Sequence, residues 1–193
     1  MKETLYISLL ILFVYIFLFM NKNKNKILIE AHGIKLMVCK DDKQKESAKL
    51  LSNIVNDIIK FKTYLYKTRK DTDCLKYEKY IKQLHNNLNS NTLIYENCPD
   101  SKYTSYSVNK GEELAICLKD KETTSLHDKN LLMYVVLHEI AHIACPEVGH
   151  TELFKDIFAF FVRKAIDINL YKYENYDDNP VNYCGMILSS NII

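Results

Sequence analysis

Two histidines four positions apart, His138 and His142, are the residues of this sequence best suited to chemistry. On an α-helix they would lie one turn apart on the same face, so both imidazoles could bind one metal ion. Glu139 would sit about 100° around the helix, where its carboxylate reaches a metal-bound water rather than the metal. Two ligands and a general base from one helical turn are typical of zinc hydrolases. The sequence therefore predicts a Zn2+ site with Glu139 as the catalytic base.

This motif lies inside an apolar stretch, LLMYVVLHEIAHIA, over residues 131–144. Burying imidazole and carboxylate groups there costs free energy unless something compensates, and a bound zinc ion would do so. The alternative is a pair of hydrogen-bonded core histidines beside an exposed glutamate. The long helical stretch, its apolar flanks and a third histidine nearby favour the metal site.

A catalytic zinc ion has three protein ligands and one open position. His150 is the first candidate for the third ligand, because a turn over residues 146–149 can bring the chain back towards His142. Three other residues stay open as alternatives: Glu152, which Asp156 could support from the next helical turn, Glu147 and Cys145.

Hydrophobic periodicity and turn residues predict one α+β domain around this motif. The helix that carries the motif would begin at Asp128, a good N-cap, and end before Pro146. The expected elements are a strand pair over 27–38 turning at Gly33, helices over 42–69 and 72–88, a strand over 92–96, a hairpin of 103–108 and 113–118, helices over 128–144 and 151–167, and an irregular tyrosine-rich segment over 170–193.

An uncharged apolar run over residues 5–20 predicts a membrane anchor. With Thr4 and Asn21 it reaches the lower limit of about 17 residues for a transmembrane helix. A cleaved signal peptide is the alternative, but the run is longer than a usual signal-peptide core and small residues at cleavage spacing are missing. We therefore expect a transmembrane anchor and basic spacer over residues 1–26, and a catalytic domain over 27–193.

Charge and cysteine usage predict where this domain lies. Three lysines follow the apolar run, against one lysine and one glutamate before it, which favours a single-pass protein with its domain on the cytosolic side. Six cysteines occur without a CxxC pair, and we expect mostly free thiols, with disulfides as the alternative.

The charge of the domain bears on its partners. Residues 27–193 hold 22 basic and 23 acidic side chains, so we do not expect nucleic acid as a partner.

The run His138-Glu-Ile-Ala-His142 … Gly149-His150-Thr-Glu-Leu-Phe154 resembles the HExxH…GHxxxF pattern of the SprT and WLM families of minimal zinc peptidases. It is most similar to short, single-pass forms encoded by large DNA viruses. The resemblance implies a zincin-like fold with His138, His142 and His150 as zinc ligands and Glu139 as the base. It also implies that the strand ending near Leu118 borders the cleft and pairs with an extended peptide.

Other zinc-peptidase families fit less well. The third histidine of a metzincin would fall at Val148, and Cys145 stands where its glycine belongs. The acidic third ligand of a gluzincin would come from a helix farther downstream, whereas Glu174 lies in a segment without helical pattern. Relatives that act on DNA–protein crosslinks are soluble and carry DNA-binding appendages, which a membrane segment and a near-neutral domain do not match.

The expected function is that of a zinc-dependent endopeptidase, in which Glu139 assists the attack of a zinc-bound water on a peptide bond of a protein or peptide substrate. The alternatives are a non-catalytic zinc-binding membrane adaptor and a DNA-associated protease. An oxyanion donor is also needed. Tyr173, Tyr176 and Tyr183 are possible donors, although packing is the more common role of such tyrosines.

Overall fold

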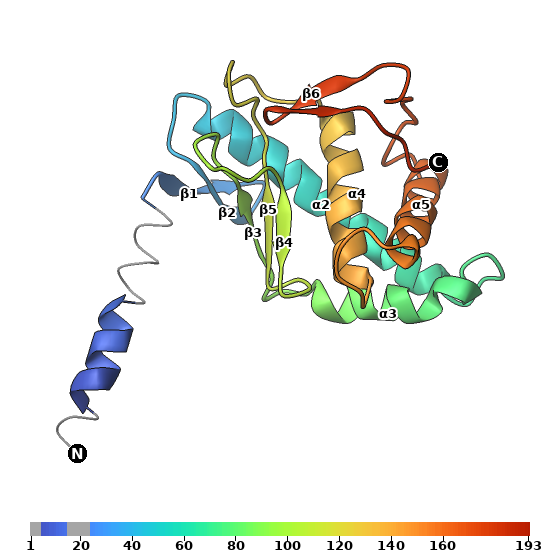
Figure 1. The fold of residues 1–193 in the computed structure, drawn as a ribbon, viewed down its shortest axis with the longest axis horizontal. Coiled ribbons are helices and arrows are strands. Elements are labelled where there is room, and N and C mark those ends of the chain that lie inside the picture. Colours follow the sequence, from blue (N-terminus) through green and yellow to red (C-terminus); the bar gives the residue numbers. More distant parts are fainter. Residues whose placement is uncertain (1–4, 15–23) are drawn as a thin grey trace.

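The structure is a computed structural model that describes residues 5–14 and 24–193. It confirms an α+β domain, in which a mixed five-stranded sheet packs beside a group of helices (Figure 1). The elements are β1 (Lys26–Ala31), β2 (Ile34–Cys39), α2 (Gln44–Thr68), the short 3-10 helix η1 (Leu75–Tyr77), α3 (Glu78–Asn87), β3 (Leu93–Glu96), β4 (Tyr106–Val108), β5 (Glu113–Ile116), α4 (Lys129–Ala144), α5 (Glu152–Asp167), β6 (Val181–Tyr183) and β7 (Met186–Leu188).

The sheet has the strand order β1-β2-β3-β5-β4. Strands β2, β3 and β5 run parallel to one another, while the hairpins β1–β2 and β4–β5 are antiparallel. Both hairpins were predicted, and the first turns at His32 and Gly33 with positive φ at both residues. Among the described residues β4 pairs with β5 alone, so its other side is a free edge of the sheet as the structure describes it.

Helix α4 carries the motif and is apolar on nearly every face. Such a helix must be buried, and α4 packs against α3, α5 and β4 near the centre of the domain (Figure 1). As predicted, Asp128 caps its start, with the carboxylate accepting a hydrogen bond from the backbone N–H of Asn130 at 2.7 Å. The helix ends at Cys145, whose backbone is extended, directly before Pro146.

Helix α5 begins at the N-cap Thr151, whose hydroxyl accepts a hydrogen bond from the backbone N–H of Phe154. Its aromatic face was predicted to be core. Phe154, Phe158 and Phe161 are indeed all buried. The first turn of α5 thereby lies against the end of α4 that carries the motif, since the two helices pack together.

The C-terminal segment differs from the prediction. Residues 170–193 were expected to be irregular, but β6 and β7 form a hairpin. Its turn is Cys184–Gly185, both at positive φ, which is the conformation of a tight two-residue hairpin turn. Each strand has only three residues, too few for alternation to be recognised.

The expectation of mostly free thiols is wrong for four of the six cysteines. The structure contains the disulfides Cys39–Cys98 and Cys117–Cys184, while Cys74 and Cys145 are free and buried. The paired residues are 59 and 67 positions apart. Only the folded chain brings their Cα atoms to 5.6 and 6.4 Å, so local spacing carried no signal of the pairing.

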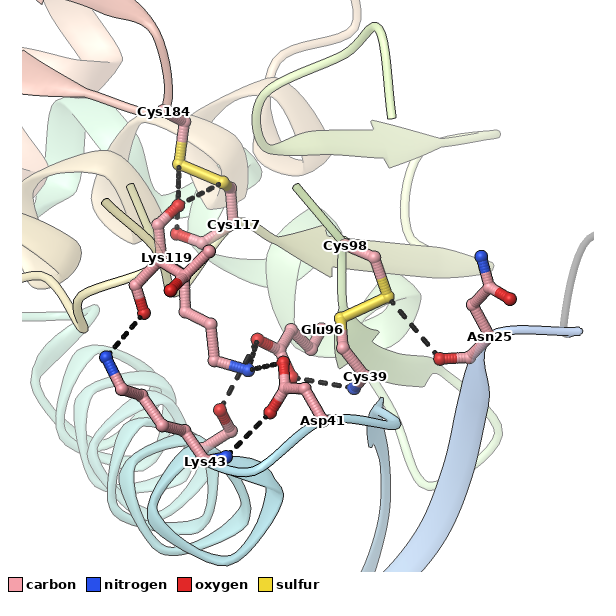
Figure 2. Close-up of polar contacts among 11 residues, drawn as sticks. Asn25, Cys39, Asp41, Lys43, Glu96, Cys98, Cys117, Lys119 and Cys184 are labelled. Atoms are coloured by element: carbon pink, nitrogen blue, oxygen red, sulfur yellow. Dashed lines mark hydrogen bonds and ion pairs between the residues drawn. A yellow bond between two sulfur atoms is a disulfide. The ribbon is translucent and has the colours of Figure 1, made fainter. Parts of the chain in front are cut away.

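A buried ion cluster lies between the two disulfides (Figure 2). The Lys119 ammonium is 3.1 Å from a carboxylate oxygen of Glu96 and 2.5 Å from one of Asp41. Glu96 also accepts a hydrogen bond from the backbone N–H of Cys39 at 2.8 Å. Since Lys119 and Glu96 are almost fully buried, each compensates the charge of the other. The cluster and the disulfides together hold the ends of β2, β3 and β5.

Residues 5–14 are helical, and their apolar side chains are exposed. Neither this helix nor any other within residues 5–14 and 24–193 is long and apolar enough to cross a membrane. Of the predicted span over residues 4–21, only residues 5–14 are described, and residues 4 and 15–21 lie outside the described part of the chain. The membrane anchor therefore stays a prediction.

Candidate metal centre

The three histidines of the motif converge on one point. The Nε2 atoms of His138 and His142 are 3.2 Å apart, those of His142 and His150 are 3.2 Å apart, and those of His150 and His138 are 3.0 Å apart. Within residues 5–14 and 24–193, this is the one group of three or more His, Cys, Asp or Glu side chains whose ligand atoms come together. The predicted set of three histidines is thus assembled by the fold.

This donor set fits a catalytic zinc ion. Ligand nitrogens at the usual zinc distance in a tetrahedral site lie about 3.3 Å from one another, close to the spacing seen here. Zinc requires neutral imidazoles. Burial, and then the neighbouring imidazoles, lower the pKa of His138 to about 3, and burial, His150 and Lys110 lower that of His142 to about 4. Three imidazole nitrogen donors leave a fourth position open for water or substrate.

Phe154 holds the imidazole rings in place. Its ring stacks on His142 at a centroid distance of 4.0 Å and meets the rings of His138 and His150 edge-on at 5.0 Å each. Because Phe154 is buried and its backbone N–H is bonded to the Thr151 hydroxyl, its ring is fixed. The aromatic residue of the motif therefore restricts the orientation of all three imidazoles.

None of the alternative third ligands joins the three histidines. The Glu152 side chain is 90% exposed and forms an ion pair with Lys155 at 2.7 Å. Asp156, its proposed partner, instead bonds Lys76 and Tyr77. The two remaining candidates, Cys145 and Glu147, are respectively buried and exposed, and neither joins the cluster of histidines.

Glu139 is buried beside the histidines, with 7% of its surface exposed. Burial raises the pKa of this carboxyl group to about 7, and hydrogen bonds from the hydroxyl and backbone N–H of Ser107 oppose the increase. Ser107 lies on β4, so the edge strand is in contact with the predicted base. A carboxyl group that titrates near neutral pH is suited to accept and return a proton.

The site opens into a cleft of about 760 Å³. The three histidines and Glu139 form part of its wall, together with residues 104–107 of β4 and the segment before it. Val148, from the turn before His150, and Met186, from β7, add exposed apolar side chains. The cleft thus runs along the free edge of the sheet.

The structure corrects the prediction of which strand borders this cleft, and it decides between the two roles considered for the tyrosines. The strand ending near Leu118 was expected to border it, but β5 lies inside the sheet between β3 and β4, and β4 is the strand at the cleft. The three candidate tyrosines do not line it. The Tyr183 hydroxyl is buried and bonds Ser105 and the carbonyl of Cys117, which is a packing role.

Several cleft residues had no local signal in the sequence. Ser107 and Lys110 belong to an ordinary hairpin pattern, and their contacts with α4 span about thirty positions of sequence. Met186 belongs to the unpredicted hairpin. Only the three-dimensional arrangement of β4 and β7 around the cleft identifies these positions.

The raised pKa of Glu139 predicts how stability changes with pH when metal is removed by a chelator. The folded chain binds this proton more tightly than the unfolded chain, so ionising Glu139 between pH 4.5 and about 7 destabilises the fold. Glu139→Gln removes this titration. We expect the variant and the wild type to have similar unfolding free energies at pH 5, and the variant to be more stable by about 2–3 kcal/mol at pH 8.

Denaturant unfolding of the full chain in detergent, with chelator present, would measure this difference. A difference between variant and wild type that does not grow from pH 5 to pH 8 would show that Glu139 is not buried as described.

Comparisons with known proteins identify viral relatives. No family model matches the chain. It is 50% identical over 117 residues to an uncharacterized protein of Acanthamoeba polyphaga mimivirus, covering 61% of this chain and 59% of that one. It is 36% identical over 101 residues to an uncharacterized protein of Invertebrate iridescent virus 6, covering 50% and 54%. The chain therefore spans about half the length of the curated relatives it matches, which are proteins of large DNA viruses, as the resemblance implied.

Among solved structures, the chain is similar to Wss1 from Saccharomyces cerevisiae, with a TM-score of 0.49 and 15% sequence identity. The match covers 68% of this chain and 88% of that one. A TM-score below 0.5 does not establish a shared fold. What the chain can do is therefore inferred from its own site: three converging histidines that could bind a metal, and a buried carboxyl group beside them.

Proposed function

We propose that this protein is a zinc-dependent endopeptidase. The observation that carries the proposal is the convergence of His138, His142 and His150 beside the buried Glu139, in a cleft bordered by a free strand edge. The likeness of this motif to the SprT and WLM pattern supports the same reading. A helix that merely buried histidines in a core would not combine these three features.

Strand β4 is suited to bind the substrate backbone. In its antiparallel pairing with β5, alternate residues of β4 direct their N–H and C=O groups to the free side. An extended peptide can add to that side as a further strand, which would hold one of its carbonyl groups beside the histidines. Binding through the backbone leaves sequence preference to the side chains that line the cleft.

Glu139 supplies the proton transfers of the reaction. Zinc, when held by the three histidines, would act as a Lewis acid that polarises the scissile carbonyl and acidifies water. Glu139 accepts a proton from the attacking water and delivers it to the departing amine nitrogen. Ser107 keeps the carboxylate beside the edge strand and therefore beside the peptide. The burial of Glu139 excludes bulk water that would otherwise compete for this proton.

We also propose that residues 4–21 attach the domain to a membrane. The exposed apolar side chains of the helix over residues 5–14 support this. The lysines that follow favour a cytosolic domain, whereas two disulfides favour an oxidising compartment. Alkylation of cysteines in freshly isolated membranes separates the two. A denaturant is included because the free thiols of Cys74 and Cys145 are buried. Six thiols that react without a reductant would place the domain in a reducing compartment, and four that react only after reduction would place it in an oxidising compartment.

Peptidase activity is tested with the full chain in detergent and a mixed peptide library. We expect cleavage within peptides, loss of cleavage after treatment with a strong chelator, and recovery when zinc is added back. Mass spectrometry of the products measures it. Zinc binding without cleavage of any peptide would leave the non-catalytic zinc-binding adaptor as the better description.

A further inference from the structure

The turn that leads from α4 to His150 has few contacts of its own. Residues 146–150 are all exposed. In the part of the chain that the structure describes, their backbone makes no hydrogen bond to another backbone group. A segment of this kind would ordinarily sample many conformations. Phe154 orients the His150 ring, so a further contact from outside the turn must hold the backbone that leads to His150.

Lys110 makes the contacts that fulfil this role. Its ammonium group donates hydrogen bonds to three backbone carbonyls: His142 at 3.1 Å, Cys145 at 2.6 Å and Glu147 at 2.6 Å. An ammonium has three N–H donors, so this set uses all of them. Two of the acceptors belong to the end of α4, where carbonyls lack helical partners and a cation is favourable. The third lies within the exposed turn.

The hairpin that carries Lys110 is itself fixed. Asn109, Lys110 and Gly111 all have positive φ, which is uncommon for a lysine. A Cβ atom at Gly111 would lie 2.9 Å from the carbonyl oxygen of Asn87 and 3.2 Å from a methyl group of Ile143. The turn is therefore wedged between the ends of α3 and α4, and it presents Lys110 from a rigid position.

We propose that Lys110 is a positioning residue for the metal site. Through the carbonyl groups of Cys145 and Glu147 it holds the turn that leads from α4 to His150, so that His150 can serve as the third ligand. This inference rests on the proposed zinc site. Lys110 follows β4 directly, so the same hairpin that forms the substrate edge also secures the third ligand. Its charge is directed at carbonyl oxygens rather than at the nitrogens that would bind the metal.

The test is the zinc affinity of the full chain in detergent, measured at pH 7 by competition with a chromophoric chelator. Loss of a group that orients a ligand typically weakens metal binding about 10–100-fold, and we expect Lys110→Met to do so. Lys110→Arg, which can still donate to the carbonyls, should recover most of the affinity. Lys155→Met, which removes a nearby cation that forms an ion pair with Glu152, should have no effect.

A double-mutant cycle distinguishes positioning from general damage. In a His150→Ala background, Lys110→Met should cause no further loss of zinc affinity, because the ligand through which it acts is gone. The melting temperature of the chelated protein serves as the control for folding. An equal loss with and without His150, or an affinity that is unchanged or higher in Lys110→Met, would overturn the inference. A wild-type protein that does not bind zinc would instead overturn the proposed function.

Discussion

Replacing Glu139 by glutamine is expected to lower kcat for peptide cleavage by about 10²–10⁴-fold while leaving zinc bound. The amide keeps the size of the side chain and can still contact Ser107, but it cannot accept the proton of the attacking water. The proposed zinc ligands are the three histidines, so the metal content should not change. The measurement is initial rates on a cleaved peptide, alongside zinc content by atomic emission.

Glu152→Gln is the matched control for this prediction. Glu152 also lies close to the proposed ligand His150, but its side chain is exposed and forms an ion pair with Lys155. Its replacement should leave both kcat and zinc content near the wild-type values. Equal peptide cleavage by the wild type and Glu139→Gln would contradict the assignment of Glu139 as the base.

The second large effect is expected from the disulfide between Cys117 and Cys184. It joins the end of β5 to the turn of the β6–β7 hairpin, across 67 positions of sequence. In the chain-entropy model, a crosslink closing a loop of that length stabilises the fold by about 4 kcal/mol. The double variant Cys117→Ser/Cys184→Ser should lose roughly that amount of unfolding free energy. Denaturant unfolding of the full chain in detergent measures it.

The same variant should also cleave peptides less efficiently, because Met186 of the freed hairpin lines the cleft. Cys74→Ser serves as the control, since Cys74 is a buried but unpaired thiol, and it should cost no more than about 1 kcal/mol. A reductant should lower the stability of the wild type at least to that of the variant. If the double variant and the wild type unfold at the same denaturant concentration, the disulfide does not secure the hairpin.

The local parts of this site could be predicted from the sequence. The spacing of His138 and His142 requires only helical periodicity, and that helix is long, apolar and capped at Asp128. His150 became the first candidate because a short turn limits how far it can move from α4. Each of these inferences depends on residues within about a dozen positions of one another, where backbone geometry determines proximity.

The remaining features depend on distant segments meeting. The disulfide partners, the Lys119–Glu96 ion pair and the contact of Ser107 with Glu139 all join parts of the chain more than twenty positions apart. Periodicity identified the β4–β5 hairpin but not which of its strands becomes the edge. That choice follows from β5 pairing with β3, a parallel contact that has no local signal.

Zinc content tests the central claim most directly. The full chain in detergent is exposed to zinc at pH 7, dialysed and measured by atomic emission, in parallel with His150→Ala and Glu152→Ala. The account predicts about one zinc ion per chain in the wild type and in Glu152→Ala, and a marked loss in His150→Ala. Zinc content that is negligible in the wild type, or that falls in Glu152→Ala and persists in His150→Ala, would contradict it.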